Sequence, residues 1–203
     1  EIYTLSLHDA LPISSWCVGW AEMRLVLFSA VFLAALLLDQ ISKFWISAHF
    51  VLFESRELVP GFFNLTYVTN NGAAFSILAG QPALWRQAVF VLINLVALAV
   101  IGLAQYRFGR NNRLYTVSLA LIAGGAAGNL CDRMRLSHVI DFLDFYIGAY
   151  HWPAFNIADS AIVLGVALFM FNSIFLEPRQ EKQHSHQPSW RSEERRVGKE
   201  CRS

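Results

Sequence analysis

Four apolar segments, each close to the length of a membrane-spanning helix, constrain this chain more than any other feature of its sequence. Charged residues make up only 15% of its 203 residues, whereas soluble domains carry roughly 25%. A helix needs about 20 residues to cross the hydrocarbon core of a bilayer. We therefore predict a mainly α-helical, polytopic membrane protein with four transmembrane helices. They cover about residues 25–46, 86–105, 114–131 and 157–176.

The positions of the basic residues predict the orientation of the chain. Arg24, the loop around Arg107 and the segment 179–182 all fall on one side of a four-span arrangement. Short loops rich in Lys and Arg stay in the cytoplasm. Both termini are therefore expected in the cytoplasm, and the connections 47–87 and 133–155 outside it. Because the net charge is only +1, there is no basic excess for phosphates, and nucleic acid is not an expected partner.

Both ends of the chain resemble translated laboratory DNA. Residues 1–13 match the translation of a common short-read sequencing adapter, and residues 191–203 match the translation of its reverse complement. Two such matches, on opposite strands of one oligonucleotide, are hard to ascribe to chance. We expect both segments to be assembly artefacts, with the native chain starting at Met23 and ending near Trp190.

The expected organisation of the chain follows from these ends. Residues 1–22 are a non-native adapter-derived and leader segment, with a native start anywhere from position 14 to 23 left open. Residues 23–178 form the membrane domain, and residues 179–190 form a polar cytoplasmic tail. Within these two parts Cys131 is the only cysteine. A disulfide framework and a cysteine-based metal site are therefore not expected.

The two outer connections differ in the structure that they predict. Residues 62–68 (FFNLTYV) are rich in aromatic and β-branched residues and are bounded by turn residues, which is typical of a strand. We expect a small extracytoplasmic β-sheet segment between helices 1 and 2. Residues 143–152, in the second connection, are expected to form an outer loop that acts as a lid.

Four aspartates lie at the outer ends of the predicted spans: Asp39, Asp132, Asp141 and Asp159. Ionisable residues at membrane depth are costly, at about 2.5–3.5 kcal/mol on insertion scales, and are therefore functional candidates. A reversing loop could bring Asp141 beside Asp159, where one carboxyl would keep a proton while the other acts as a base. Such a pair can activate water. The alternative for Asp159 is a carboxylate favoured by the dipole at the start of the fourth helix.

Two alternatives to this pair are a metal site and a membrane protein of another class. A metal site would draw on His138, Asp141 and His151, but their spacing matches no standard ligand pattern and no His-Glu-x-x-His motif occurs. No metal is therefore expected. A small transporter or a membrane assembly protein would also carry carboxylates, although a transporter normally places them near the middle of the bilayer.

Five short motifs follow one another along the chain: DQISK at 39–43, NGAAF at 71–75, GGAAGNLCDR at 124–133, VIDF at 139–142 and PAFNIAD at 153–159. In this order they resemble the bacterial lipoprotein signal peptidases, also called signal peptidase II, a family of aspartic intramembrane peptidases. The resemblance implies an endopeptidase that removes the signal peptide of diacylglyceryl-modified prolipoproteins on the N-terminal side of the lipidated cysteine. It implies an aspartate dyad, an activated water and no cofactor.

The same resemblance assigns roles to individual residues and a place in the cell. The catalytic pair would be Asp141 and Asp159, with the order of protonation left open. Substrate-binding roles fall on Asn71, Asn129, Arg133 and Asn156. Structural support falls on Asp39, Lys43, Gly72 and Asp132. The implied location is the bacterial cytoplasmic (inner) membrane, with the site near the periplasmic face, phospholipid around it and the protein monomeric.

Some of these residues also have simpler interpretations. Asp39 and Lys43 are spaced i,i+4, which suits a local ion pair on a helix. Asn71-Gly72 is a common turn dipeptide. The small residues at 124–128 are typical of closely packed membrane helices. These interpretations are compatible with the functional ones.

Overall fold

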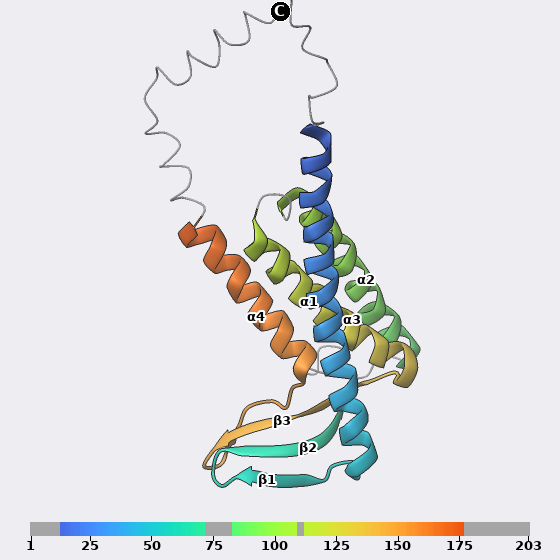
Figure 1. Ribbon diagram of the computed structural model, residues 1–203. Coiled ribbons are helices and arrows are strands. Elements are labelled where there is room, and N and C mark those ends of the chain that lie inside the picture. Colours follow the sequence, from blue (N-terminus) through green and yellow to red (C-terminus); the bar gives the residue numbers. More distant parts are fainter. Residues whose placement is uncertain (1–12, 72–82, 109–111, 177–203) are drawn as a thin grey trace, which may run out of the picture.

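The computed structural model describes residues 13–71, 83–108 and 112–176. Four long helices run side by side, with a small sheet at one end (Figure 1). The helices are α1 (Ile13–His49), α2 (Ala83–Phe108), α3 (Arg113–Leu136) and α4 (Ile157–Phe171), the last continued by the π-helical η3 (Asn172–Leu176). The predicted terminal segments 1–12 and 177–203 lie outside the described residues.

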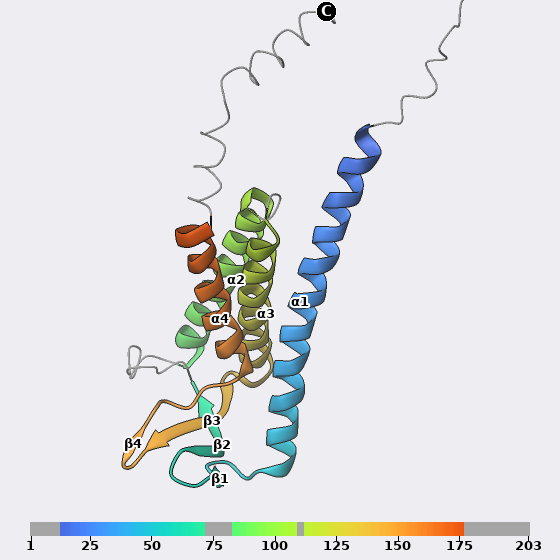
Figure 2. The ribbon, with the colours of Figure 1, turned by 60° about the vertical axis from the view of Figure 1, so that its left-hand side comes forward.

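Each of the four helices contains a stretch long and apolar enough to cross a membrane. These stretches are Glu22–His49, Leu84–Phe108, Arg113–Leu136 and Ile157–Leu176. The prediction of a mainly helical protein with four membrane helices is therefore confirmed. The start of α1 and the end of α4 lie at the end of the helices opposite the sheet (Figures 1 and 2).

The third helix extends further than the sequence predicted. It ends at Leu136 instead of position 131, and Ser137 caps it in the left-handed conformation at φ 66°, donating its backbone N–H to the Arg133 carbonyl at 3.1 Å. Asn129, Asp132 and Arg133 consequently lie on the last turns of a helix, although the prediction placed Arg133 at the start of an outer connection.

Helix α3 is the centre of the bundle, because two-thirds of its spanning window is buried, compared with 17% or less in the other three. Its small residues let its neighbours approach closely. A Cβ on Gly124 would lie 2.8 Å from the Phe32 carbonyl oxygen of α1, and one on Gly125 would collide with the Ala158 carbonyl oxygen of α4. The outer sides of α1, α2 and α4 expose apolar side chains such as Leu92, as expected of helices that face lipid.

We expect Gly125→Ala to lower the free energy of unfolding by about 1–3 kcal/mol, as overpacking does in other cores. The added methyl would meet the α4 backbone and lie 2.8 Å from Ile162 Cγ1, so the two helices would have to separate. Gly102→Ala on α2 is the matched control, because a Cβ there meets nothing within 4 Å. Unfolding in mixed detergent micelles measures both. Equal stability of the two variants would show that the α3–α4 contact is not tight.

The sheet has four antiparallel strands in the order β1-β2-β3-β4. They are β1 (Ser55–Val59), β2 (Phe63–Asn70), β3 (Val139–Ile147) and β4 (Tyr150–His151). The predicted small sheet between helices 1 and 2 is confirmed by β1 and β2. The predicted outer loop at 143–152 is wrong, because these residues complete β3 and turn into β4. Aromatic and β-branched residues in VIDFLDFYI favour a strand, and β2 supplies its partner.

Strand β3 connects the sheet to the start of α4. It pairs with β2 in a register that sets Asp141 opposite Val68, after a bulge between Leu65 and Val68. On its other side, the backbone N–H groups of Phe142 and Leu143 donate to the Phe155 carbonyl at 3.0 and 2.8 Å. Asp141 is therefore held on a strand between β2 and the segment that leads into α4, and the turn between β3 and β4 reverses the chain before it reaches Asp159.

Candidate active site

The first turn of α4 carries Asp159 in a fixed geometry. Asn156 is the N-cap, and its side-chain oxygen accepts from the Asp159 backbone N–H at 3.0 Å. The Asp159 carboxylate accepts in return from the Asn156 backbone N–H at 3.3 Å, which completes a capping box. Asp159 is thus a carboxylate at the start of a helix, as its alternative interpretation from the sequence proposed. One carboxylate oxygen, Oδ1, is not used by the cap.

Asp141 approaches the same asparagine from the sheet. Asn156 Nδ2 donates to Asp141 Oδ1 at 2.7 Å, and Asn70 Nδ2 donates to Oδ2 at 3.0 Å. Asn156 is fully buried and Asp141 is only 3% exposed, whereas Asp159 is half-buried. Burial raises the pKa of Asp141 from 3.8 to about 6; the Asn70 hydrogen bond opposes this shift, and the nearby charge of Asp159 adds to it. The two aspartates are therefore electrostatic neighbours joined through one asparagine.

The titration of Asp141 can be followed by infrared spectroscopy. Because its pKa is raised to about 6, we expect its protonated-carboxyl C=O band to disappear as the pH rises through about 6. Asp159→Asn removes a like charge, which lowers the pKa of Asp141 and moves this loss to lower pH. Asp141→Asn should remove the band. An unchanged midpoint in Asp159→Asn would contradict the proximity of the two carboxyls.

Asn129 on α3 links Asp159 to the interior of the bundle. Its Nδ2 donates to Asp159 Oδ1 at 2.8 Å, and its Oδ1 accepts from Lys43 Nζ at 3.1 Å and from Asn156 Nδ2 at 3.3 Å. Since Lys43 can only donate, it determines which end of the Asn129 amide faces Asp159. The orientation of this amide is consequently fixed by a charged group on α1.

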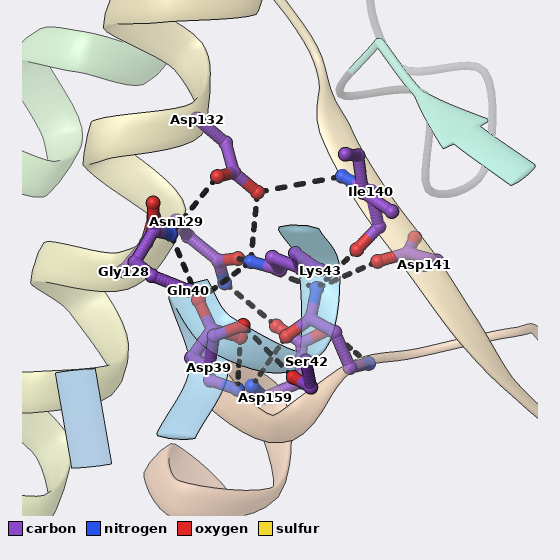
Figure 3. A network of polar contacts seen from close by, with 12 residues as sticks. Asp39, Gln40, Ser42, Lys43, Gly128, Asn129, Asp132, Ile140, Asp141 and Asp159 are labelled. Carbon is purple, nitrogen blue, oxygen red and sulfur yellow. Dashed lines mark hydrogen bonds and ion pairs between the residues drawn. The ribbon is translucent and has the colours of Figure 1, made fainter. Parts of the chain in front are cut away.

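Lys43 itself lies between two carboxylates (Figure 3). Its Nζ is 2.8 Å from Asp39 Oδ2 and 2.8 Å from Asp132 Oδ2, and all three residues are buried. Asp39 Oδ1 also accepts from the Ala158 backbone N–H at 2.9 Å, next to Asp159. The structure thus includes the expected i,i+4 pair of Asp39 and Lys43 on α1, extended by Asp132 on α3, and Asp39 fixes the start of α4 through the Ala158 N–H.

Two residues of this network were not predicted as site residues. Gln40 Nε2 donates to Asp132 Oδ1 at 3.0 Å and to the Gly128 carbonyl at 3.2 Å, which ties α1 to α3. Asn70 bonds Asp141, as described above. Both are sequence neighbours of predicted residues, Gln40 of Asp39 and Asn70 of Asn71, and this adjacency was the signal that could have found them.

The remaining predicted residues lie to one side of the aspartates. Arg133 donates from Nη1 to the Asn129 carbonyl at 3.3 Å, and its guanidinium lies 5.2 Å from the centre of the Phe90 ring. Asn71 is exposed and lines a cavity of about 230 Å³ together with Arg133. The structure does not bring Asn71 into the network around Asn156. Gly72 lies outside the described residues.

The residues of the rival metal site are placed apart. His151 Nδ1 lies 3.0 Å from Asp144 Oδ1, and its ring stacks on Tyr146. His138 lines the cavity beside Arg133, while Asp141 bonds the two asparagines. Within the described residues no group of three His, Cys, Asp or Glu side chains is placed to hold a metal ion.

Comparisons with known proteins agree on one family. The family model described as signal peptidase (SPase) II matches residues 31–175. The lipoprotein signal peptidase of Syntrophus aciditrophicus is 47% identical over 150 residues, covering 74% of this chain and 93% of that protein. That of Yersinia pestis is 44% identical over 167 residues, covering 82% and 92%.

A solved structure shows the same architecture. It is a bacterial membrane enzyme determined by the in meso method at 1.9 Å resolution, with a TM-score of 0.64 and 30% identity, covering 76% of this chain and 94% of that one. The family match covers all the described aspartates of the network, from Asp39 to Asp159. The chain therefore belongs to the signal peptidase II family.

Proposed function

We propose that this chain removes the signal peptide of diacylglyceryl-modified prolipoproteins by cleaving on the N-terminal side of the lipidated cysteine. The lipoprotein signal peptidases among its relatives support the reaction class. The observation that carries the mechanism is that Asn156 bonds both aspartates, Asp141 through its side chain and Asp159 through its cap. Two carboxyls held on one buried asparagine can share a proton and a water.

The proposed reaction is the addition of water to one peptide bond. One carboxylate of the dyad takes a proton from the water as its oxygen attacks the carbonyl carbon that precedes the cysteine. The other carboxyl, which holds a proton, gives it to the departing nitrogen as the C–N bond breaks. The products are a signal peptide with a new carboxylate and a lipidated cysteine with a free amine. The dyad gains one proton and gives one up, so its total charge is unchanged and the two carboxyls have exchanged protonation states. The proton of the new carboxylic acid is released to solvent.

The neighbouring polar residues fit supporting roles in this reaction. Asn129 holds Asp159 Oδ1 by a hydrogen bond, and Asp159, which is only half-buried, is left accessible to the substrate. Arg133 and Asn71 line the adjoining cavity and are proposed to bind the substrate backbone. The buried cluster of Asp39, Lys43 and Asp132 supports the site indirectly. Asp39 bonds the start of α4, and Lys43 bonds the Asn129 amide.

We also propose that the sheet end faces the periplasm and that both termini are cytoplasmic. The connection between α2 and α3 is short and has Arg107 in the last turn before it and Arg113 at the first position after it, and Lys or Arg in short loops favours the cytoplasm. A site at the outer membrane face suits a substrate that is anchored there by its own lipid. A transporter pathway is disfavoured, since Asp141 lies outside the four spans.

The test is a cleavage assay with purified full chain in detergent and one prolipoprotein prepared with and without diacylglyceryl modification. We expect the lipidated form to be cut, and mass spectrometry to find the lipidated cysteine at the new N-terminus. Cleavage elsewhere would disprove the proposed bond. A folded chain that leaves several lipidated substrates intact would favour a transporter or assembly role.

A further inference from the structure

A cavity of about 230 Å³ beside the aspartates has, next to Arg133, two basic groups that the proposed reaction does not use, Arg86 and His138. It lies between the start of α2 and the end of α3, and two arginines and a histidine line it: Arg86, Arg133 and His138. Its apolar lining includes Leu84 and Phe90. None of the described residues that line the cavity is acidic. The cavity is therefore suited to an anion that has an apolar part.

Among the three basic residues of the cavity, Arg86 is the one available to bind a ligand. It is half-buried, and over the described ranges of the chain it has neither a hydrogen bond nor an ion pair. Arg133, by contrast, bonds the Asn129 carbonyl and lies on the Phe90 ring. A guanidinium is suited to bidentate contact with phosphate. The two guanidiniums and the His138 ring line one cavity and together carry several donors suited to a phosphate.

The position of the cavity indicates the source of the phosphate. The α2 span begins at Leu84 and the α3 span ends at Leu136, so the cavity lies at the level where the hydrocarbon ends and lipid headgroups begin. The phosphates of phospholipid headgroups lie at this level, within reach of guanidinium groups that can bond them by two parallel hydrogen bonds. We propose that the cavity binds the phosphate of an anionic phospholipid, with Arg86 as its main ligand and the acyl chains along Leu84 and α2.

This lipid is different from the one on the substrate. The diacylglyceryl group of a prolipoprotein is joined to cysteine by a thioether and carries no phosphate, so it offers nothing to Arg86. That distinction rests on the proposed function, whereas the binding of phospholipid does not. Because the bound phosphate would touch Arg133, it would also restrain the arginine that holds the Asn129 carbonyl.

Native mass spectrometry of the full chain tests the proposal without any substrate. The chain, in a neutral detergent, is titrated separately with phosphatidylglycerol, phosphatidylcholine and inorganic phosphate. We expect phosphatidylglycerol to be retained in preference to phosphatidylcholine. Arg86→Gln should weaken this binding about tenfold or more, as expected for the loss of charge-assisted hydrogen bonds. Arg86→Lys should bind more tightly than Arg86→Gln, since it keeps the charge.

Arg107→Gln is the matched control, because Arg107 is an exposed arginine at the opposite end of the same helix. Its affinity should equal that of the unaltered chain. Equal binding of both phospholipids, or equal loss in the Arg86 and Arg107 variants, would overturn the proposal. Binding of inorganic phosphate without phosphatidylglycerol would also overturn it and assign the cavity to a free anion. An unfolding temperature equal to that of the unaltered chain shows that Arg86→Gln is folded.

Discussion

Replacing Asp141 or Asp159 by asparagine is expected to slow signal-peptide cleavage by about 10²- to 10⁴-fold, the usual contribution of a general acid or base. Asparagine has nearly the same shape as aspartate but can neither take a proton from water nor return one. Each variant also replaces one accepting oxygen by an NH₂ group that faces another donor. That donor is Asn156 or Asn70 at position 141, and Asn129 or the Asn156 backbone N–H at position 159. The fold should survive, because one unsatisfied buried donor costs only about 1–3 kcal/mol.

The same strand offers a control for this prediction. Asp144→Asn makes the same chemical change three residues from Asp141, at a side chain that bonds Asn64 and His151 instead of the site. It should cleave at the rate of the unaltered chain. Single-turnover cleavage of lipidated prolipoprotein measures all three variants, with unfolding temperatures alongside. Normal cleavage by a well-folded Asp141→Asn or Asp159→Asn would remove that residue from the proposed chemistry.

The helical part of the fold could be predicted because an apolar stretch of about 20 residues is the length of a membrane-spanning helix and is compatible with few other structures. The ends of the helices were less predictable, as α3 shows: its last turns contain Asp132 and Arg133, which are polar enough to suggest a loop. These residues stay helical because Lys43 neutralises Asp132, and Ser137 caps the end. The charge of Lys43 comes from another helix, α1, and the sequence around Asp132 does not reveal it.

The site was predictable in its residues but not in its geometry. The aspartates are candidates from their depth and their motifs, whereas their link through Asn156 depends on the register of β3 on β2, which puts Asp141 opposite Val68. A bulge in that pairing changes which face a side chain occupies, and nothing in the sequence of either strand specifies it. The contribution of Asn70 follows from the same pairing, since it sits opposite Val139.

Lys43→Met is expected to lower the free energy of unfolding by about 3–5 kcal/mol, the usual cost of removing one partner of a buried ion pair. Methionine fills a similar volume but leaves Asp39 and Asp132 uncompensated in the interior of the bundle. Unfolding in mixed detergent micelles measures the loss. The control is Ser42→Ala, at the preceding residue of α1. It loses only a hydrogen bond to the Asp39 carbonyl and should lower the free energy of unfolding by about 1 kcal/mol or less.

A double-variant cycle separates the loss of charge pairing from the loss of volume. If Lys43 acts by neutralising carboxylates, then Lys43→Met together with Asp132→Asn should cost less than the sum of the two single changes. Additive losses would mean that packing alone is responsible. Cleavage gives a second readout, because Asn129 loses its charged donor and keeps only the 3.3 Å hydrogen bond from Asn156 to orient its amide toward Asp159. We therefore expect the double variant to regain stability but not cleavage, since neither change restores a charged donor to Asn129.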